Sequence, residues 1–173
     1  MSNKILVFLE QRNGQIKKSS FEVASKGLEL ATKLNYEISF VTIGSEISNS
    51  SDLKEFGVSE LVHLKNSNLS EYSSSAYTQL LKNFALENKA TILLFSNTAM
   101  GKDLSPRLAV KLNAGVMSDL IALEISGTEL IGTRPIYAGK ALEEIKLVSD
   151  FKVLTLRPNV FKAEKRETAS FSV

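Results

Sequence analysis

The chain has 173 residues, which is enough for one ordinary globular domain and too few for two. Its 43% hydrophobic and 23% charged residues are typical of a folded globular protein and exclude a disordered chain. The net charge is +2 and the basic residues are scattered, so we expect no nucleic-acid partner. The absence of cysteine excludes disulfides, thiol nucleophiles and thiolate metal sites.

The amino terminus predicts neither a signal peptide nor a membrane anchor. The first apolar run, 5–9, is short and ends at Glu10, which does not fit a secretory signal. No apolar run approaches the roughly 18 residues that a helix needs to cross a bilayer. We therefore expect a cytoplasmic protein without membrane insertion.

Apolar runs and amphipathic segments alternate along the first two thirds of the chain. The runs that predict strands are 5–9, 36–43, 59–65 and 90–95. The segments that predict helices are 19–34, 52–57, 73–88 and 105–113. This alternation implies parallel strands joined by right-handed crossovers, with helices on both faces of the sheet.

The last third changes to short β-type runs joined by brief turns. These runs are 117–125, 129–139, 141–148 and 151–158, and Gly127 marks a hairpin-like bend. We expect two or three closing strands, some of them antiparallel, although 141–148 alone could form a helix. Residues 162–173 are polar without a helical stripe, so they predict a linker or tail after a domain that spans 1–161.

The chain offers no complete catalytic set. The single histidine, His63, lies in a strand-like run without the carboxylate spacing of a metal or catalytic site. Glu143 and Glu144 are adjacent and point to opposite faces of a strand, so they cannot act together as acid and base. Metalloprotease, EF-hand and nucleophile-elbow motifs do not occur. We expect no metal site and no enzyme activity in this chain.

Two predicted loops flank the point where ligands bind in doubly wound sheets. If the strand order is 3-2-1-4, these are the loops 10–14 and 96–105, which follow the first and fourth strands. The second loop leads to a helix N-terminus, where backbone N–H groups can hold an anion. Gly101, Lys102 and Ser105 are therefore a candidate anion loop.

The same loop departs from a working phosphate loop. A Walker motif needs glycine where Ser96 stands and a hydroxyl where Asp103 stands, and that carboxylate would repel a phosphate. Ser105 can instead cap a helix that starts at Pro106, or Asp103 can cap it with Pro106 in the first turn. A cation at Arg107 would oppose the dipole of that first turn, which favours a carboxylate across an interface as its partner. We therefore favour a capped turn over a nucleotide site.

Three segments of the last half resemble the amino-terminal domain of electron transfer flavoprotein alpha subunits. They are GKDLSPRLAVKLNAGVMSDLIAL (101–123), TRPIYAGKA (133–141) and VLTLRPNVF (153–161), and the opening segment 4–31 is similar to the start of that family. The family pattern is G-[RK]-[DN]-L-x-P-R-[LV]-A followed by R-x-I-Y-A-G-[NK]-A. The resemblance implies an α/β fold with a mostly parallel, doubly wound, nucleotide-binding-like sheet, similar to adenine nucleotide alpha hydrolases, with antiparallel closing strands in the C-terminal third.

The resemblance also implies a role in an FAD-containing electron carrier. Such a carrier takes electrons from flavoprotein dehydrogenases, and its alpha subunit pairs with a beta subunit. Alpha subunits of the family are much longer and hold FAD mainly in a carboxyl-terminal domain, so we expect no FAD-binding residue in this chain. The domain is then a scaffold and docking unit, with Arg107, Arg134 and Tyr137 as candidate interface residues.

Two questions stay open from the residues alone. The chain is either a piece of a longer subunit or a natural stand-alone domain. A different function is a free-standing adenine-nucleotide binder of the universal-stress type that uses the loop 96–105. The glycines that such a site needs are missing from that loop.

Overall fold

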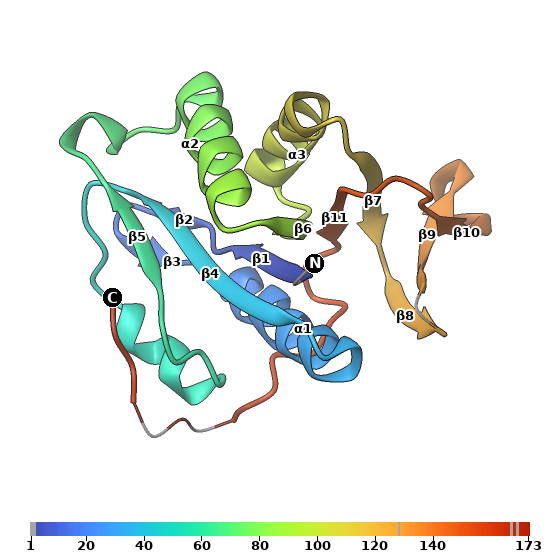
Figure 1. The fold of residues 1–173 in the computed structure, drawn as a ribbon, viewed down its shortest axis with the longest axis horizontal. Coiled ribbons are helices and arrows are strands. Elements are labelled where there is room, and N and C mark those ends of the chain that lie inside the picture. Colours follow the sequence, from blue (N-terminus) through green and yellow to red (C-terminus); the bar gives the residue numbers. More distant parts are fainter. Residues whose placement is uncertain (1–2, 128, 167, 169) are drawn as a thin grey trace.

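The computed structural model describes residues 3–127, 129–166, 168 and 170–173. Its centre is a parallel sheet with the strand order β5-β4-β1-β6-β11-β7 (Figure 1). The strands are β1 (Lys4–Phe8), β4 (Glu37–Gly44), β5 (Val62–Lys65), β6 (Ala90–Ser96), β7 (Gly115–Leu120) and β11 (Lys152–Leu156). The order of the first four predicted strands, 3-2-1-4, is confirmed.

Helices cover both faces of this sheet. Helix α1 (Lys18–Leu34) lies on one face, and α2 (Ser74–Glu87) and α3 (Ala99–Leu112) lie on the other (Figure 1). Because side chains alternate along a strand, Val7 of β1 packs in the cluster under α1 and Leu6 packs in the cluster under α2 and α3. Burial on both faces explains why the central strands are apolar without alternation.

The close packing of α1 depends on one glycine. A Cβ on Gly27 would lie 2.7 Å from a methyl group of Val7, so a larger residue would push the helix off the sheet. Asn35, in a left-handed conformation, ends the helix and donates its N–H to the last turn. The helix predicted at 19–34 is confirmed, as is the one predicted at 73–88. The short helix predicted at 52–57 is a 3-10 helix, Ser50–Glu55.

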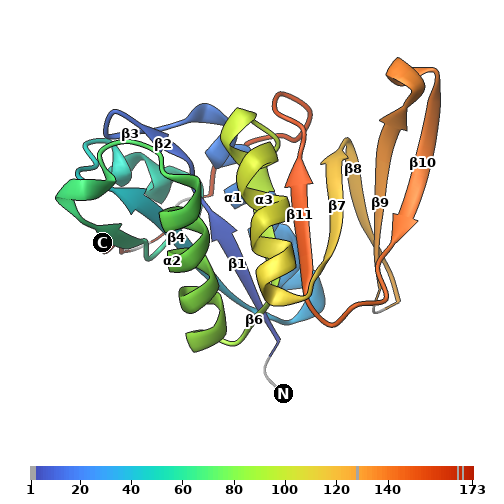
Figure 2. The ribbon, with the colours of Figure 1, turned by 90° about the horizontal axis from the view of Figure 1, so that it is seen from above.

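The closing strands form a second, three-stranded antiparallel sheet beside β7 (Figure 2). Its order is β10-β9-β8, with β8 (Ala122–Ser126), β9 (Glu129–Ile136) and β10 (Ala141–Lys146). The expectation of antiparallel closing strands is confirmed, and 141–146 is a strand rather than a helix. Their expected number, two or three, is wrong, because five strands follow α3 in the described residues and the run 117–125 is divided between β7 and β8. The last run, β11, instead enters the parallel sheet between β6 and β7, where four of its five residues are buried.

The tail returns to the body of the domain. Arg166 forms a parallel bridge with Phe56, and Ser172 forms one with Glu60. The Leu61 N–H donates to the Ser172 carbonyl at 2.9 Å. The tail therefore pairs with the residues just before β5, which is an edge strand of the parallel sheet. Whether 162–173 also connects to a further domain stays a prediction.

Candidate functional site

The strand order reverses between β1 and β6, whose carboxyl ends lie side by side. The chain continues from β1 into the hairpin of β2 (Gln11–Arg12) and β3 (Gln15–Ile16), and from β6 into α3. A cavity of about 460 Å³ opens at this crevice. Its lining includes Glu10, Arg12, Lys17, Tyr72, Tyr77 and Met100. The predicted ligand position of a doubly wound sheet therefore exists as a cavity in this chain.

A carboxylate of the chain itself occupies the anion position of this crevice. The Glu10 side chain is 7% exposed, accepts a hydrogen bond from the Thr98 hydroxyl and pairs with the Lys17 ammonium at 3.0 Å. Thr98 is the N-cap of α3, since its hydroxyl oxygen accepts the Gly101 N–H at 3.1 Å. A negative charge near a helix N-terminus is favourable, and here the protein supplies that charge.

The predicted start of α3 is wrong. The helix begins at Ala99 with Thr98 as its cap, so neither Ser105 nor Asp103 is the N-cap. Pro106 lies inside the helix with an exposed side chain, although a proline there lacks the N–H that would bond to the preceding turn. The prediction failed because it treated proline as a first-turn residue.

The three residues of the candidate anion loop do not converge on one point. Gly101 lies in the first turn of α3, and a Cβ there would lie 1.8 Å from the Ser96 carbonyl oxygen. Lys102 is exposed, whereas Ser105 is buried one turn further along. Glycine at 101 is therefore required by the close approach of helix and strand. An anion-binding role for Gly101, Lys102 and Ser105 stays a prediction, and the three residues do not face one common site.

Arg107 has a partner within its own helix. Its Nε donates to the Asp103 carboxylate at 2.9 Å, four residues earlier. Since α3 starts at Ala99, Arg107 is not in the first turn, and the predicted conflict with the helix dipole does not arise. The Tyr72 hydroxyl also donates to Asp103, at 2.6 Å. These hydrogen bonds from Tyr72 and Arg107 lower the pKa of Asp103, whereas burial and the Asp103 carboxylate raise the pKa of Tyr72.

The other two interface candidates belong to β9 and the turn after it, whereas Arg107 belongs to α3. Figure 2 shows the antiparallel sheet apart from α3. Arg134 of β9 pairs with Glu143 of β10 at 2.7 Å and donates to the Ser118 hydroxyl of β7 at 3.3 Å. Tyr137 is 78% exposed and begins the turn between β9 and β10. Three successive residues of this turn, Tyr137, Ala138 and Gly139, have φ values of 50°, 56° and 88°. The tip thus holds an aromatic ring outward on a constrained backbone.

Residues considered for catalysis have structural surroundings. The His63 Nε2 lies 3.1 Å from the Gly44 carbonyl oxygen, on the neighbouring strand β4. Glu143 stands opposite Arg134 in the sheet register and Glu144 stands opposite Thr133, so the two carboxylates point to opposite faces. Within the described part of the chain, no three His, Asp or Glu residues lie close enough to hold a metal ion. None of the described helices is long and apolar enough to cross a membrane.

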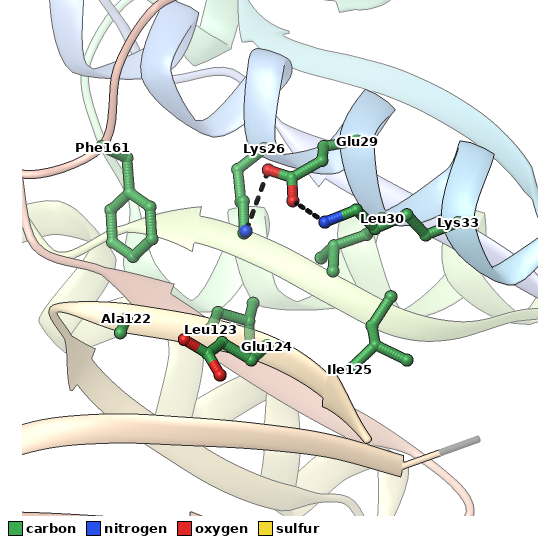
Figure 3. A pocket seen from close by; sticks show the side chains of 9 residues that line it. All are labelled: Lys26, Glu29, Leu30, Lys33, Ala122, Leu123, Glu124, Ile125 and Phe161. Carbon is green, nitrogen blue, oxygen red and sulfur yellow. Dashed lines mark hydrogen bonds and ion pairs between the residues drawn. The ribbon is translucent and has the colours of Figure 1, made fainter. Parts of the chain in front are cut away.

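A second cavity, of about 630 Å³, separates α1 from β8 (Figure 3). Figure 3 shows Glu29 between Lys26 and Lys33, and Glu124 on the opposite wall. Glu29 forms ion pairs with Lys26 at 2.9 Å and with Lys33 at 2.7 Å. Burial acts to raise the pKa of Glu29, but hydrogen bonds from Lys33 and Lys26 outweigh it and lower the pKa. The two lysines and two glutamates that line this cavity give it no net charge, so its lining does not favour an ion of one sign.

Sequence reasoning missed two residues. Glu10 ends the first apolar run, but its partner Thr98 is 88 positions away and cannot be inferred locally. Asp119 forms an ion pair with Arg157 at 2.6 Å, across 38 positions. One signal was available for α3: Thr98 precedes Gly101 by three residues directly after an apolar strand, which is the spacing of an N-cap.

Comparison with known proteins gives the family of the chain. The family model of the electron transfer flavoprotein domain matches residues 5–172. The chain is 33% identical to Protein FixB of Clostridium saccharobutylicum over 172 residues, which are 98% of this chain and 52% of that protein. It is 31% identical to electron transfer flavoprotein subunit alpha of Bacillus subtilis (strain 168) over 170 residues, again 98% and 52%.

A third relative agrees with these two. Electron transfer flavoprotein subunit alpha of Clostridium acetobutylicum is 34% identical over 163 residues, which are 91% of this chain and 48% of that protein. The chain therefore spans about half the length of the curated relatives it matches. The fold, the order of the motifs and the full-length match agree, and the chain belongs to the electron transfer flavoprotein family.

Proposed function

We propose that this chain is the amino-terminal scaffold and docking domain of an electron transfer flavoprotein alpha-type subunit. The observation that carries the proposal is the three-stranded sheet, which stands beside the parallel sheet and presents exposed apolar side chains. Tyr137 is 78% exposed and Leu142 is 63% exposed, both at the β9–β10 hairpin. Exposed apolar groups on a rigid hairpin are typical of a surface that a partner covers. The designation of the relatives as subunit alpha supports a second subunit as that partner.

FAD does not fit the crevice of this chain. A flavin dinucleotide needs an anion site for its diphosphate, and Glu10 places a carboxylate at the N-terminus of α3 instead. The Glu10 carboxylate and a diphosphate at the same helix N-terminus would repel each other. Displacing Glu10 would leave the Thr98 hydroxyl and the Lys17 ammonium without their hydrogen-bond partner. FAD in the complete carrier would therefore be bound mainly outside these residues, and this domain would hold no redox centre.

The same contact argues against the adenine-nucleotide binder. A universal-stress type site would place phosphates at the loop 96–105, where Gly101 already donates its N–H to Thr98 and Lys102 points to solvent. We therefore infer that the chain serves an electron carrier and is not itself a catalyst. Flavoprotein dehydrogenases would donate electrons to the assembled complex.

Co-expression tests this function. A tagged alpha-type subunit that contains this chain is expressed with an electron transfer flavoprotein beta subunit and purified through the tag. We expect a stoichiometric complex with the visible absorbance of bound flavin, whereas this chain alone binds no flavin. If the tagged subunit purifies without the beta subunit and without flavin, the proposal is wrong.

A further inference from the structure

Asp119 stands where the chain leaves the parallel sheet and enters the antiparallel sheet. It lies near the end of β7, and β8 begins at Ala122. Its backbone is left-handed, with φ of 62°, which is uncommon for a residue that has a Cβ. The pairing of β7 with β11 is also irregular at this point, between Leu154 and Leu156. Such a backbone persists only where its surroundings hold it.

Side chains from two neighbouring strand ends hold Asp119. Arg157, just after β11, donates Nε to one carboxylate oxygen at 3.0 Å and Nη2 to the other at 2.6 Å. Asn97, just after β6, donates its amide to the same carboxylate at 2.6 Å. Thr155 accepts the Asp119 N–H at 2.9 Å and donates to the Asn97 side-chain oxygen at 2.9 Å. Asp119, Asn97 and Thr155 form a closed ring of hydrogen bonds, and Arg157 adds its two bonds to the Asp119 carboxylate from outside. We call these four residues the Asp119 ring.

The backbone beside the Asp119 ring links both sheets. The Arg157 N–H donates to the Leu120 carbonyl at 2.8 Å, which ties β11 to the end of β7. The next residue, Ile121, donates its N–H to the Thr133 carbonyl of β9 at 2.8 Å. The ring therefore lies within two residues of the first backbone hydrogen bond to the antiparallel sheet, and the Ser118 hydroxyl, one residue before Asp119, accepts a hydrogen bond from Arg134 of that sheet. A change in the backbone at Asp119 would be transmitted directly to that sheet.

We propose that Asp119 is the positioning residue that sets the orientation of the antiparallel sheet on the parallel sheet. The bidentate contact with Arg157 fixes the direction of the carboxylate, and the ring holds the left-handed backbone that turns the chain outward. The direction of this turn then sets where β9 and the hairpin tip with Tyr137 lie relative to the parallel sheet. The consequence for partner docking rests on the proposed function, but the consequence for the geometry of the sheets does not.

A distance measurement tests the positioning role. The chain has no cysteine, so two introduced cysteines carry spin labels without background. Lys140→Cys marks the hairpin tip and Lys111→Cys marks the end of α3, and both positions are exposed. Pulsed electron paramagnetic resonance should give one narrow distance distribution. Asp119→Asn keeps a residue that tolerates the left-handed backbone but removes the charge that Arg157 contacts, so the distribution should broaden or shift.

A second readout and a matched control separate orientation from stability. In Asp119→Asn, hydrogen exchange of the Ile121 amide should become about tenfold faster, because the neighbouring network is weakened. Leu81→Ala makes a cavity in the core cluster under α2, which contains no residue of the Asp119 ring, and should lower stability without broadening the distribution. Equal broadening in Leu81→Ala would overturn the proposal, as would an unchanged distribution in Asp119→Asn.

Two more variants complete the test. Asp119→Gly accepts the left-handed backbone without strain but lacks the carboxylate, and we expect it to broaden the distribution as Asp119→Asn does. A narrow distribution in Asp119→Gly would overturn the role of the ring. If Asp119→Asn does not fold, Arg157→Gln breaks the same pair from the other side and must give the same broadening. Broadening without any change in beta-subunit affinity would support Asp119 as the positioning residue and contradict docking through this sheet.

Discussion

The Thr98 hydroxyl donates a hydrogen bond to Glu10 while its oxygen accepts the Gly101 N–H at 3.1 Å. This contact joins the two strand ends that form the ligand crevice of a doubly wound sheet. It caps α3 and places a negative charge at the helix N-terminus. The crevice is therefore retained as a cavity, but its anion position is filled by the protein.

Replacing Glu10 should test whether the carboxylate excludes anions. Glu10→Ser removes the charge and frees Lys17 and the Thr98 hydroxyl, so we expect weak binding of inorganic phosphate, on the order of millimolar. The unaltered protein should bind neither phosphate nor AMP. Isothermal titration with sodium phosphate and with AMP measures both. Glu46→Gln, which removes an exposed carboxylate, is the control and should bind neither.

The stability of a more conservative variant at the same position gives an independent measurement. Glu10→Gln should lower the free energy of unfolding by about 1–3 kcal/mol, because the buried negative charge that pairs with Lys17 is lost and an amide NH2 group replaces one of the two accepting oxygens. Urea unfolding checks this value. A micromolar affinity of the unaltered protein for AMP would contradict our interpretation of the crevice.

Gly101 and Lys102 should differ sharply when replaced. Gly101→Ala places a methyl group 1.8 Å from the Ser96 carbonyl oxygen, and backbone on both sides must move, so we expect a loss of about 3 kcal/mol or more. Lys102→Ala removes an exposed side chain and should change stability by less than about 0.5 kcal/mol. Thermal unfolding of the two variants compares them. Similar small losses in both would show that the helix does not need glycine at 101.

The contribution of Asp119 should depend on pH. Hydrogen bonding and charge attraction from Arg157 outweigh burial and lower the pKa of Asp119 below its ordinary value of 3.8. A carboxyl whose pKa is lowered by folding stabilises the native state above its unfolded pKa, and this stabilisation is lost as the pH falls through the folded pKa. Since about one third of each side chain is exposed, we expect only about 1 kcal/mol at neutral pH.

The measurement is urea unfolding of the native protein and Asp119→Asn between about pH 6 and pH 3. The stability difference between them should shrink toward the acid end of this range. Glu46→Gln serves as control for general charge effects, because Glu46 pairs with Lys65 on an exposed surface. A difference that grows as the pH falls would contradict the ion pair with Arg157.

The parallel sheet was predictable because its signals are local. Continuous apolar runs such as 90–95 indicate strands buried on both faces, and intervening amphipathic segments indicate crossover helices. The position of β11 was not predictable, because the neighbours of a strand are decided by pairing across the sheet and not by its own residues. The run 151–158 therefore predicted a strand correctly, but it did not predict that this strand lies between β6 and β7.

The site was less predictable than the fold. The end of the strand before the predicted loop 96–105 was located correctly, but most of that loop is helix, because Pro106 suggested a helix start that the structure places seven residues earlier, at Ala99. The expectation that Arg107 needs a carboxylate from outside followed from the wrong helix start. In the structure, Asp103 of the same helix forms an ion pair with Arg107. Contacts such as Glu10 with Thr98 bring together residues far apart in the chain, and one sequence carries no local sign of them.

Docking through the antiparallel sheet is the central claim, and the affinity of the chain for a beta subunit measures it most directly. Tyr137→Ala and Val110→Ala each remove an exposed apolar side chain, 78% and 82% exposed, from the hairpin tip and from α3 respectively. Isothermal titration of an electron transfer flavoprotein beta subunit should show that Tyr137→Ala weakens binding about tenfold or more, while Val110→Ala binds as the unaltered chain does. Equal affinities for all three proteins, or no binding by any of them, would contradict the account.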